Sequence, residues 1–295
     1  MLFLNFNSIM IYITGHTGFI GSHLKKYLGT KAQGVNLRVS KSISLSPGDA
    51  LVHLAGKAHD LKNASDPSEY FEVNTELTKE LFEQFLASEA RDFVFMSSVK
   101  ALEGKDKGAS AYSQSKLMAE EYILSKQVPE GKRVFMLRPV MVHGPHNKGN
   151  LNLLFGAVKR FGFWPLAAFH NKRSFVAVDN VCFMISEILS NPNIPSGVYT
   201  LADAIPFSTN ELVAMAAEAL HKKVRFISVS KGLVRGLAYI GGGLGLALNP
   251  PRLEKLTENA VYDGSPLLSL IGKEVTLTPK EGFKKTFESF VNYDG

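Results

Sequence analysis

The sequence of 295 residues holds a single cysteine, Cys182. One cysteine excludes an internal disulfide framework and fits a reducing compartment. Because Cys182 lies in the apolar run VCFMI, we interpret it as an inert buried thiol and not as a nucleophile.

Long apolar runs are also missing. The longest, GLAYIGGGLGLALNPP at 236–251, is too short and too rich in glycine to span a bilayer. The first residues, MLFLNFNSIM, lack the basic leader, the apolar length and the small-residue cleavage site of a signal peptide. We therefore expect a cytoplasmic protein, in which residues 1–8 form a poorly fixed extension before a strand that begins near Ile9.

The basic residues do not form the pattern of a nucleic-acid-binding protein. The net charge is +6 and the pI is about 9.2, but the lysines and arginines are scattered, without an arginine-rich arm. A phosphorylated small molecule explains this balance, and we expect no nucleic-acid partner. His143 and His146 lie close in the sequence without further paired ligands, so we expect no metal and place both beside a substrate loop.

Apolar, β-branched runs alternate with amphipathic helical patterns over the first half of the chain. This alternation predicts a Rossmann-type doubly wound parallel sheet in an α/β fold. We expect a dinucleotide-binding domain at 9–147 and a smaller, mixed α/β substrate-binding portion at 148–295, with the chain crossing back near 174–200. The expected strands of the first domain are 9–14, 34–40, 50–56, 92–98 and 133–140, and the expected helices are 19–28, 67–90 and 112–126.

The stretch TGHTGFIG places Gly15, Gly18 and Gly21 at the first strand-to-helix turn. Glycine lets the backbone approach a pyrophosphate, and the free amides at the helix N-terminus bind its charge. The turn therefore predicts a dinucleotide site, to which we also assign Thr17, Phe19 and Ile20.

No aspartate or glutamate occurs between Gly21 and Gly48, where an acid would bind the ribose 2′-hydroxyl of NAD. Arg38 and Lys41 stand there instead, and a basic pair suits a 2′-phosphate. The pair favours NADP slightly over NAD, and a solvated strand end is the alternative interpretation.

Small and hydroxyl side chains follow two strands and face the expected crevice. Leu54, Ala55 and Gly56 leave room for a nicotinamide ribose, and Ser97 and Ser98 end the strand at 92–98. Tyr112 and Lys116 of YSQSK share one face of a helix at i and i+4. A phenol near pKa ~10 is a poor base, so we expect the ammonium and an oxidised nicotinamide to lower its pKa. Serine, tyrosine and lysine in this arrangement predict a hydride-transfer site.

These motifs occur together with VNT (73–75), RPVMVHGP and RSFVAVDN, in an order that resembles the extended short-chain dehydrogenase/reductases. More narrowly, the chain resembles the nucleotide-sugar 4-epimerases and 4-keto-sugar reductases of surface-polysaccharide synthesis. The similarity runs from Ile9 to about 278–283. It implies a homodimer, through the helices at 67–90 and 112–126.

The resemblance also implies roles for single residues. Tyr112 would be the acid/base, Lys116 would bind the nicotinamide ribose, and Ser98 would share the substrate oxygen. The other implied residues are Asn74 behind the site, Pro139 and Val140 against the nicotinamide, and Asn150, Arg173 and, more weakly, Arg252 for the nucleotide diphosphate.

Three departures from the family pattern stand out. The segment before ALVHLAG is short, where the family usually has an extra helix and strand with an acidic contact to the adenine end. The loop between Ser98 and Tyr112 is short and rich in lysine. Met141 replaces a polar substrate contact of many UDP-galactose 4-epimerases.

The sequence leaves the reaction open. Val99 and Lys100 replace the acid pair of the family's dehydratases, which leaves a UDP-hexose or UDP-N-acetylhexosamine 4-epimerase or a 4-keto-sugar reductase. A non-catalytic NAD(P)-binding sensor is the alternative. The run at 231–249 predicts a glycine-interrupted core helix, or else a membrane contact that would suit a substrate carried on a polyprenyl diphosphate.

Overall fold

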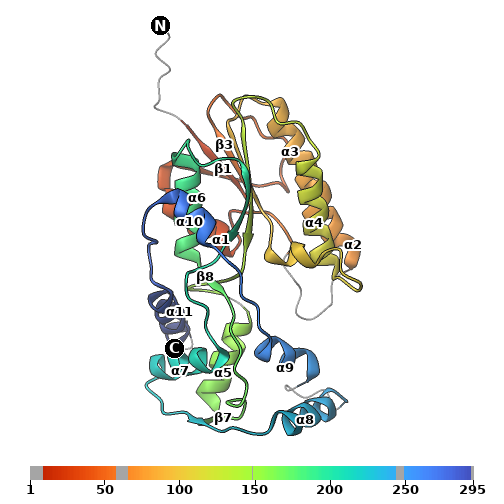
Figure 1. Ribbon diagram of the computed structural model, residues 1–295. Coiled ribbons are helices and arrows are strands. Elements are labelled where there is room, and N and C mark those ends of the chain that lie inside the picture. The colour runs from red at the N-terminus through yellow and green to blue at the C-terminus, as the bar shows by residue number, and fades with distance from the viewer. Residues whose placement is uncertain (1–8, 58–65, 148, 244–248, 294–295) are drawn as a thin grey trace. The chain divides into compact units, whose positions relative to one another are not determined.

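The computed structural model describes residues 9–57, 66–147, 149–243 and 249–293 (Figure 1). The expected extension at 1–8 lies outside these residues. The chain forms two compact units. The first unit comprises Met1–Val140, Val181–Leu201 and Gly264–Val275, and the second comprises Met141–Asn180, Ala202–Asp263 and Thr276–Gly295.

The first unit contains a six-stranded, wholly parallel sheet in the order β2-β1-β3-β4-β5-β9. The predicted doubly wound α/β fold is confirmed. The strand order reverses between β1 and β3, so the loops after these two strands flank the crevice where such sheets bind ligands. The strands are β1 (Ile11–Thr14), β2 (Ala32–Val35), β3 (Ala50–His53), β4 (Asp92–Met96), β5 (Arg133–Pro139) and β9 (Gly197–Leu201).

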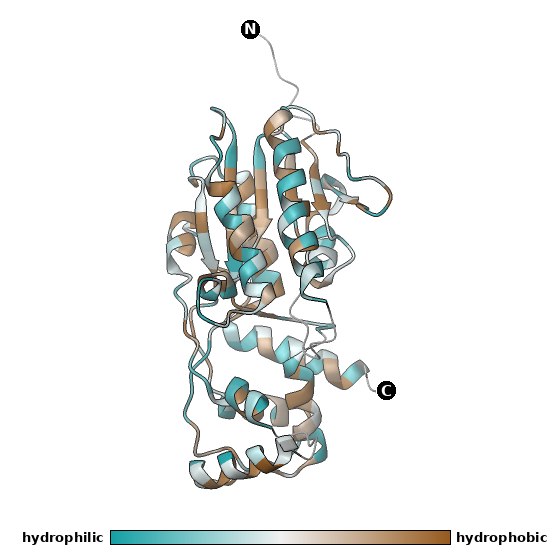
Figure 2. Cartoon of the chain, turned by 90° about the vertical axis from the view of Figure 1, so that its right-hand side faces the viewer, coloured by the Kyte–Doolittle hydropathy of each residue, from teal (hydrophilic) through white to brown (hydrophobic). Residues whose placement is uncertain are grey.

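Helices cover both faces of this sheet. One face carries α1 (Phe19–Leu28), α6 (Val178–Ser190) and α10 (Ser265–Ile271), and the other carries α3 (Leu77–Ala87) and α4 (Ala111–Leu124) (Figure 1). Every residue of β3 and β4 is buried, as expected for strands covered on both faces. Figure 2 shows hydrophilic stretches on the outward sides of the helices in front of the sheet.

The second strand lies earlier than predicted. β2 ends at Val35, and residues 36–49 form neither a helix nor a strand. The carbonyl of Asn36 accepts hydrogen bonds from the amides of Val39 and Ser40, and its side chain accepts one from the Arg38 amide at 3.1 Å. This turn ends the strand, so Arg38 stands in a turn beyond β2 and not within a strand. The region in which the family has an extra helix and strand is indeed short here.

The helix predicted at 67–90 is interrupted. It consists of α2 (Pro67–Phe71), a π-helical turn η2 (Glu72–Glu76) and α3. The Asp66 side chain caps its start by accepting from the Ser68 amide at 2.9 Å. A π turn inside a helix inserts one residue into the turn and is frequent at functional sites. The inserted turn contains Asn74.

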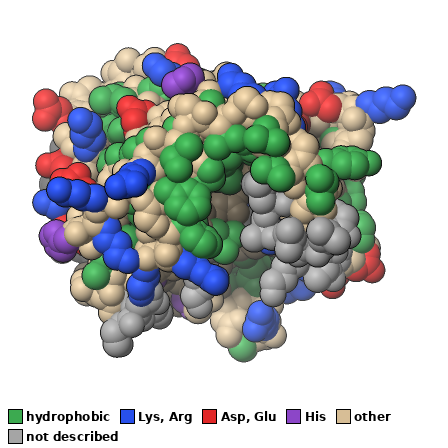
Figure 3. Space-filling view, turned by 90° about the horizontal axis from the view of Figure 1, so that it is seen from below, with side chains coloured by type: hydrophobic (Ala, Val, Ile, Leu, Met, Phe, Trp, Pro, Cys, Tyr) green, Lys and Arg blue, Asp and Glu red, His purple; other side chains and the backbone are tan. Residues whose placement is uncertain are grey.

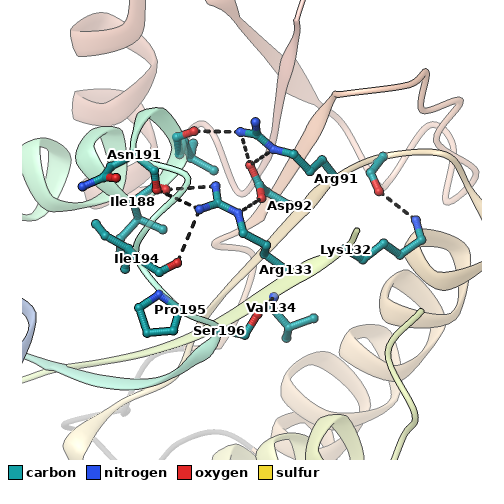
Figure 4. Close-up of polar contacts among 12 residues, drawn as sticks. Arg91, Asp92, Lys132, Arg133, Val134, Ile188, Asn191, Ile194, Pro195 and Ser196 are labelled. Carbon is teal, nitrogen blue, oxygen red and sulfur yellow. Dashed lines mark hydrogen bonds and ion pairs between the residues drawn. The ribbon is translucent and has the colours of Figure 1, made fainter. Parts of the chain in front are cut away.

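A buried ion-pair cluster ties the segment 181–201 to the sheet (Figure 4). Arg133 and Arg91 donate to the carboxylate of Asp92 at 2.7 Å each, and the Asp92 side chain is 1% exposed. Arg133 also donates to the carbonyls of Ile188 and Asn191, at 3.1 and 2.8 Å. Because of these bonds and the pairing of β9 with β5, the segment Val181–Leu201 belongs to the first unit although it lies beyond residue 147.

Short 3₁₀ turns complete the first unit. They are η1 (Gly29–Lys31) and η3 (Val99–Glu103), the latter directly after the strand end that carries Ser98. The amide of Lys100 donates to the Ser98 hydroxyl oxygen at 3.2 Å, which caps η3.

The second unit is a smaller mixed α/β part with two short parallel strand pairs, β6–β8 and β7–β10. Its core is rich in phenylalanine, with Phe283 and Phe287 of α11 fully buried. A capping box begins α7, because Ser208 and Glu211 each bond the other's backbone. The elements are β6 (Met141–His143), α5 (Asn150–Arg160), β7 (Phe163–Trp164), β8 (Phe175–Ala177), α7 (Thr209–Ala219), β10 (Arg225–Phe226), α8 (Lys231–Gly243), α9 (Pro250–Thr257) and α11 (Pro279–Tyr293).

His143 differs from the expectation that it lines a substrate loop. It is fully buried, its ring stacks on Phe283 with centroids 4.0 Å apart, and its Nδ1 lies 3.0 Å from the Thr286 hydroxyl. Burial lowers the pKa of His143 to about 3. Its chemistry is that of a neutral core histidine. Cys182 is buried, as predicted.

Replacing Arg133 with methionine should lower the free energy of unfolding by about 3 kcal/mol, because the buried Asp92 carboxylate loses a charged partner. Urea unfolding followed by circular dichroism measures the change. Lys273→Met is the control: it removes the exposed ion pair with Glu187, and we expect less than about 1 kcal/mol. Equal losses in both variants would contradict a stabilising role for the cluster.

Candidate active site

The glycine turn packs tightly against the end of β3. Gly15 has a φ of +68°, and a Cβ built on it would lie 2.5 Å from the Ala55 nitrogen. A Cβ on Gly21 would lie 2.2 Å from the Gly15 carbonyl oxygen. Only glycine fits at these two positions, and its use brings the first amides of α1 to the crevice edge, where they can bind an anion.

A cavity of about 610 Å³ opens beside this turn. Seven of the residues that line this cavity were predicted to bind the cofactor. Three further predicted residues, Phe19, Ile20 and Gly21, follow directly in the first turn of α1. The lining consists of Gly15, His16, Thr17, Gly18, Val35, Asn36, Leu37, Arg38, Lys41, Leu54, Ala55, Gly56, Glu72, Val73 and Leu77.

Three polar lining residues were missed from the sequence, His16, Asn36 and Glu72. His16 lies within the glycine turn, although we did not assign it to the site. Asn36 is the first residue beyond β2, the position that we assigned too late along the chain. Its preference for turns is the signal that could have found it. Glu72 comes from the π turn, for which the sequence carries no comparable signal.

Tyr112 and Ser98 meet at the carboxyl edge of the sheet. A hydrogen bond from Ser98 lowers the pKa of Tyr112, but burial is the larger effect and raises it overall. Tyr112 is in the first turn of α4, which Ser110 caps, and its ring packs edge-on against Tyr70. We expected the Lys116 ammonium together with an oxidised nicotinamide to lower the pKa of this phenol; in the protein alone burial shifts it upward, and the combined effect stays a prediction.

The Lys116 ammonium is held by the sheet. It is buried, donates to the Met96 carbonyl at 2.8 Å and lies 4.8 Å from the centre of the Phe95 ring. Burial lowers the pKa of Lys116 to about 8, while the Glu120 carboxylate raises it. Glu120 is itself buried and paired with Arg138 at 2.5 Å, which anchors α4 to β5. Lys116 therefore remains largely charged at neutral pH.

Asn74 links the π turn to the helix that carries Tyr112. Its Nδ2 donates to the Lys57 carbonyl and to the Ser115 hydroxyl, both at 3.1 Å, and its Oδ1 accepts from the Lys57 amide at 2.8 Å. Ser115 in turn donates to the Tyr112 carbonyl at 3.0 Å. The role predicted for Asn74, support from behind, agrees with these contacts.

A buried histidine continues this network to the glycine turn. His53 Nδ1 lies 2.7 Å from the Thr14 hydroxyl and its Nε2 lies 3.0 Å from the Thr78 hydroxyl. Thr78 donates its proton to the Asn74 carbonyl at 2.8 Å, so Nε2 of His53 must donate to Thr78 and Nδ1 must accept. This is the neutral imidazole, and burial lowers the pKa of His53 to about 3.

The residues of the crevice fit a nicotinamide dinucleotide. The Ser97 hydroxyl is buried and has no hydrogen-bond partner among the described residues, which leaves it available to a polar group of such a cofactor. Pro139 and Val140 are buried at the end of β5, on the same edge of the sheet. No cluster of three or more potential metal ligands occurs within the described part of the chain.

The residues predicted to bind the nucleotide diphosphate of the substrate belong to the second unit. Asn150 begins α5, and Arg252 is exposed near the start of α9. Arg173 is already engaged: it donates to the Lys255 carbonyl and lies 3.4 Å from Glu258. Burial lowers the pKa of Arg173, and the Glu258 carboxylate opposes this. Met141 begins β6 and is half-buried.

The family model described as "NAD dependent epimerase/dehydratase family" matches residues 36–202, more than half of the chain. The chain belongs to this family. The predicted resemblance is thereby confirmed.

Three curated relatives span most of the chain. UDP-glucose 4-epimerase of Vibrio cholerae is 26% identical, with 95% of each chain covered. N-acetyl-alpha-D-glucosaminyl-diphospho-ditrans,octacis-undecaprenol 4-epimerase of Escherichia coli O157:H7 is 25% identical over 83% of this chain and 78% of that protein. GDP-6-deoxy-D-mannose reductase of Pseudomonas aeruginosa is 24% identical over 74% and 82%.

The fold agrees with solved structures. RMD from Pseudomonas aeruginosa in complex with NADPH is 18% identical, with a TM-score of 0.71 and 95% of this chain and 99% of that chain covered. Other structures of this fold hold NAD. Similar proteins thus bind either nicotinamide cofactor.

Acid should destabilise the protein through His53. Its pKa falls from 6.5 in the unfolded chain to about 3 in the folded protein, so only the unfolded chain binds a proton between these values. Above pH 6.5 the protonation of His53 does not lower the free energy of unfolding. Below pH 6.5 it lowers the free energy of unfolding by about 1.4 kcal/mol per pH unit.

His53→Gln tests this directly, because glutamine does not titrate there. The slope of unfolding free energy against pH, measured by urea unfolding between pH 5.5 and 4.5, should be smaller in the variant by about 1.4 kcal/mol per pH unit. His143 contributes equally to both proteins. Equal slopes would mean that folded His53 accepts a proton.

Proposed function

We propose that the protein is an NAD(P)-dependent nucleotide-sugar oxidoreductase that acts at C4, either a 4-epimerase or a 4-keto-sugar reductase. The observation that carries this proposal is the hydrogen bond between Ser98 and Tyr112 beside the dinucleotide-sized cavity. The buried Lys116 ammonium stands one helical turn further along the same helix.

In this proposal, Tyr112 exchanges the proton of the C4 oxygen. Burial raises the pKa of Tyr112, so its phenol is protonated at neutral pH, the form that donates a proton to a 4-keto sugar. Ser98 binds the same oxygen and fixes its position relative to the phenol. When bound, the nicotinamide supplies or accepts the hydride at C4.

Oxidation of a C4 hydroxyl requires the tyrosinate, and the Lys116 ammonium is a fixed cation that can stabilise it. The Met96 carbonyl holds the Lys116 ammonium in place, and the neighbouring Glu120 carboxylate pairs with Arg138. The charge of Lys116 favours the tyrosinate by attraction. Lys116 thus serves both directions of the reaction.

The substrate would be a UDP-hexose, a UDP-N-acetylhexosamine or the corresponding 4-keto sugar, with Asn150, Arg173 and Arg252 as the residues proposed for its diphosphate. Guanidinium groups form paired hydrogen bonds with phosphates. A sugar carried on a polyprenyl diphosphate presents the same diphosphate chemistry. A homodimer through the segments at 67–90 and 112–126 remains part of the proposal.

A non-catalytic NAD(P)-binding sensor is the second candidate. It predicts cofactor binding without turnover and no need for Tyr112. The full set of Ser98, Tyr112 and Lys116, each held by several contacts, supports catalysis instead.

The nucleotide held by freshly purified protein separates the two reactions. An epimerase retains NAD that is released only on denaturation, whereas a reductase is purified empty and binds NADPH better than NADH. Protein that binds neither nucleotide would overturn the proposal.

Tyr112→Phe should reduce turnover of the sugar substrate by about 10²–10⁴-fold while leaving cofactor binding nearly unchanged, because only the proton-transfer group is lost. The matched control is Tyr122→Phe on the same helix, whose hydroxyl donates to Glu83. We expect the control to keep its rate within about twofold, since the hydroxyl is a surface group. Similar rates in both variants would favour the sensor.

Arg38→Ala should weaken NADPH binding by about tenfold or more and leave NADH binding unchanged, because the guanidinium would pair with the 2′-phosphate. Isothermal titration of the apo-protein with each nucleotide measures this. Lys26→Ala, on the exposed side of α1, is the control. Equal weakening for both nucleotides would show that Arg38 does not select NADP.

A further inference from the structure

The helix α8 of the second unit is apolar on its outer side. Val234 and Ala238 are buried in the core of the unit. Leu233, Leu237 and Ile240 recur at helical spacing on another face and are 58%, 51% and 60% exposed. These three side chains form a continuous exposed stripe along the helix.

Polar side chains do not balance this stripe. Between Lys231 and Gly243 the only charged residues are Lys231 and Arg235, and the remaining outward positions are glycines and the exposed Tyr239. A helix at a protein surface ordinarily presents charged or polar groups to water. The outer side of α8 therefore calls for an apolar environment.

Two neighbouring strands extend the apolar surface. Phe163 of β7 and Phe226 of β10 are both exposed, and so are the adjacent Phe161 and Ile227. Trp164 of β7 belongs to the same buried cluster as Val234, so strand and helix are anchored in one core. Figure 1 shows β7 and α8 at the same end of the second unit, and Figure 3 looks onto that end.

The chain around this surface is mainly basic, although Glu254 of α9 lines the same hollow as Arg235 and Ala238 of α8. The sequence contains no aspartate or glutamate from residue 219 to 253, a stretch that includes Lys222, Lys223, Arg225, Lys231, Arg235 and Arg252. The segment 141–178, which contains β7, also has no acidic residue. Figure 3 shows several lysines and arginines beside the hydrophobic side chains on this face, with acidic side chains also present toward its rim.

We infer that this surface, made of α8 and the β7–β10 pair, binds the headgroup region of an anionic lipid bilayer. Exposed apolar side chains that enter the interface, combined with basic residues that face anionic headgroups, are the features of peripheral membrane contact. A second copy of the chain would bring the same positive charge to the contact, which disfavours self-association through this face.

The contact is interfacial. Within the ranges that the structure describes, no helix is long and apolar enough to cross a membrane. Residues 244–248 of the run that we singled out from the sequence lie outside those ranges, so the inference rests on 231–243 and the two strands. This inference does not depend on the proposed reaction. Binding to a bilayer would also place the protein at the membrane, where a sugar carried on a polyprenyl diphosphate is found.

The test is flotation of the full chain with vesicles of phosphatidylcholine alone or with one third phosphatidylglycerol. We expect the protein to float with the anionic vesicles, and the fraction that floats with the neutral vesicles to be at least about tenfold smaller. The fraction bound to the anionic vesicles should decrease as the salt concentration increases. The double variant Leu237→Glu/Ile240→Glu should lose at least about tenfold of the binding, because two carboxylates enter the stripe. Its NAD(P) binding should be unchanged, which shows that it is folded.

Leu270→Glu is the matched control, since Leu270 is an exposed leucine on α10 of the first unit. It should float like the unaltered protein. The inference is overturned if the unaltered protein does not float, if the double variant still floats, or if sedimentation shows that the stripe instead joins two copies of the chain. None of these outcomes depends on whether the protein turns over a sugar.

Discussion

A single buried chain of hydrogen bonds holds the candidate site together. It runs from Thr14 at the end of β1 through His53 and Thr78 to the carbonyl of Asn74, whose side chain continues it through Ser115 to the backbone of Tyr112. The glycine turn and the helix of the candidate acid/base are thereby fixed to each other. Leaving a polar group unpaired in this buried interior costs free energy. We therefore expect the residues of this chain of hydrogen bonds to keep their positions relative to one another.

The π turn supplies the central member of this chain. Asn74 lies within that turn, and its side chain bonds both the Lys57 carbonyl and the Ser115 hydroxyl. Its carbonyl accepts from the hydroxyl of Thr78, four residues later, a bond that threonine also forms in regular helices. The π turn and α4 are thereby joined by buried hydrogen bonds.

The sequence predicted the alternation of the sheet and the glycine turn because both depend on local patterns. It misplaced β2, since Val35, Leu37 and Val39 alternate like a strand. In the structure Leu37 instead packs on the core from an irregular segment, as do Ile43 and Leu45. The π turn and the pairing of β9 with β5 depend on contacts between distant residues, which no local pattern contains. The grouping of Ser98 with Tyr112 was predicted, but the upward shift of the phenol pKa follows from burial, which a sequence does not display.

The return of the chain to the sheet has a consequence for dividing the protein. β9 covers the hydrogen-bonding edge of β5, and the cluster around Asp92 fastens the segment that leads to it. A fragment that ends at residue 140 would keep the glycine turn, Ser98, Tyr112 and Lys116. It would, however, expose the edge of β5 that pairs with β9, and Arg133 would lose the carbonyls of Ile188 and Asn191. Such an edge is a template for pairing with other chains. Residues on both sides of position 140 thus build one sheet. We expect a fragment that contains only residues up to 140 to aggregate instead of binding a dinucleotide.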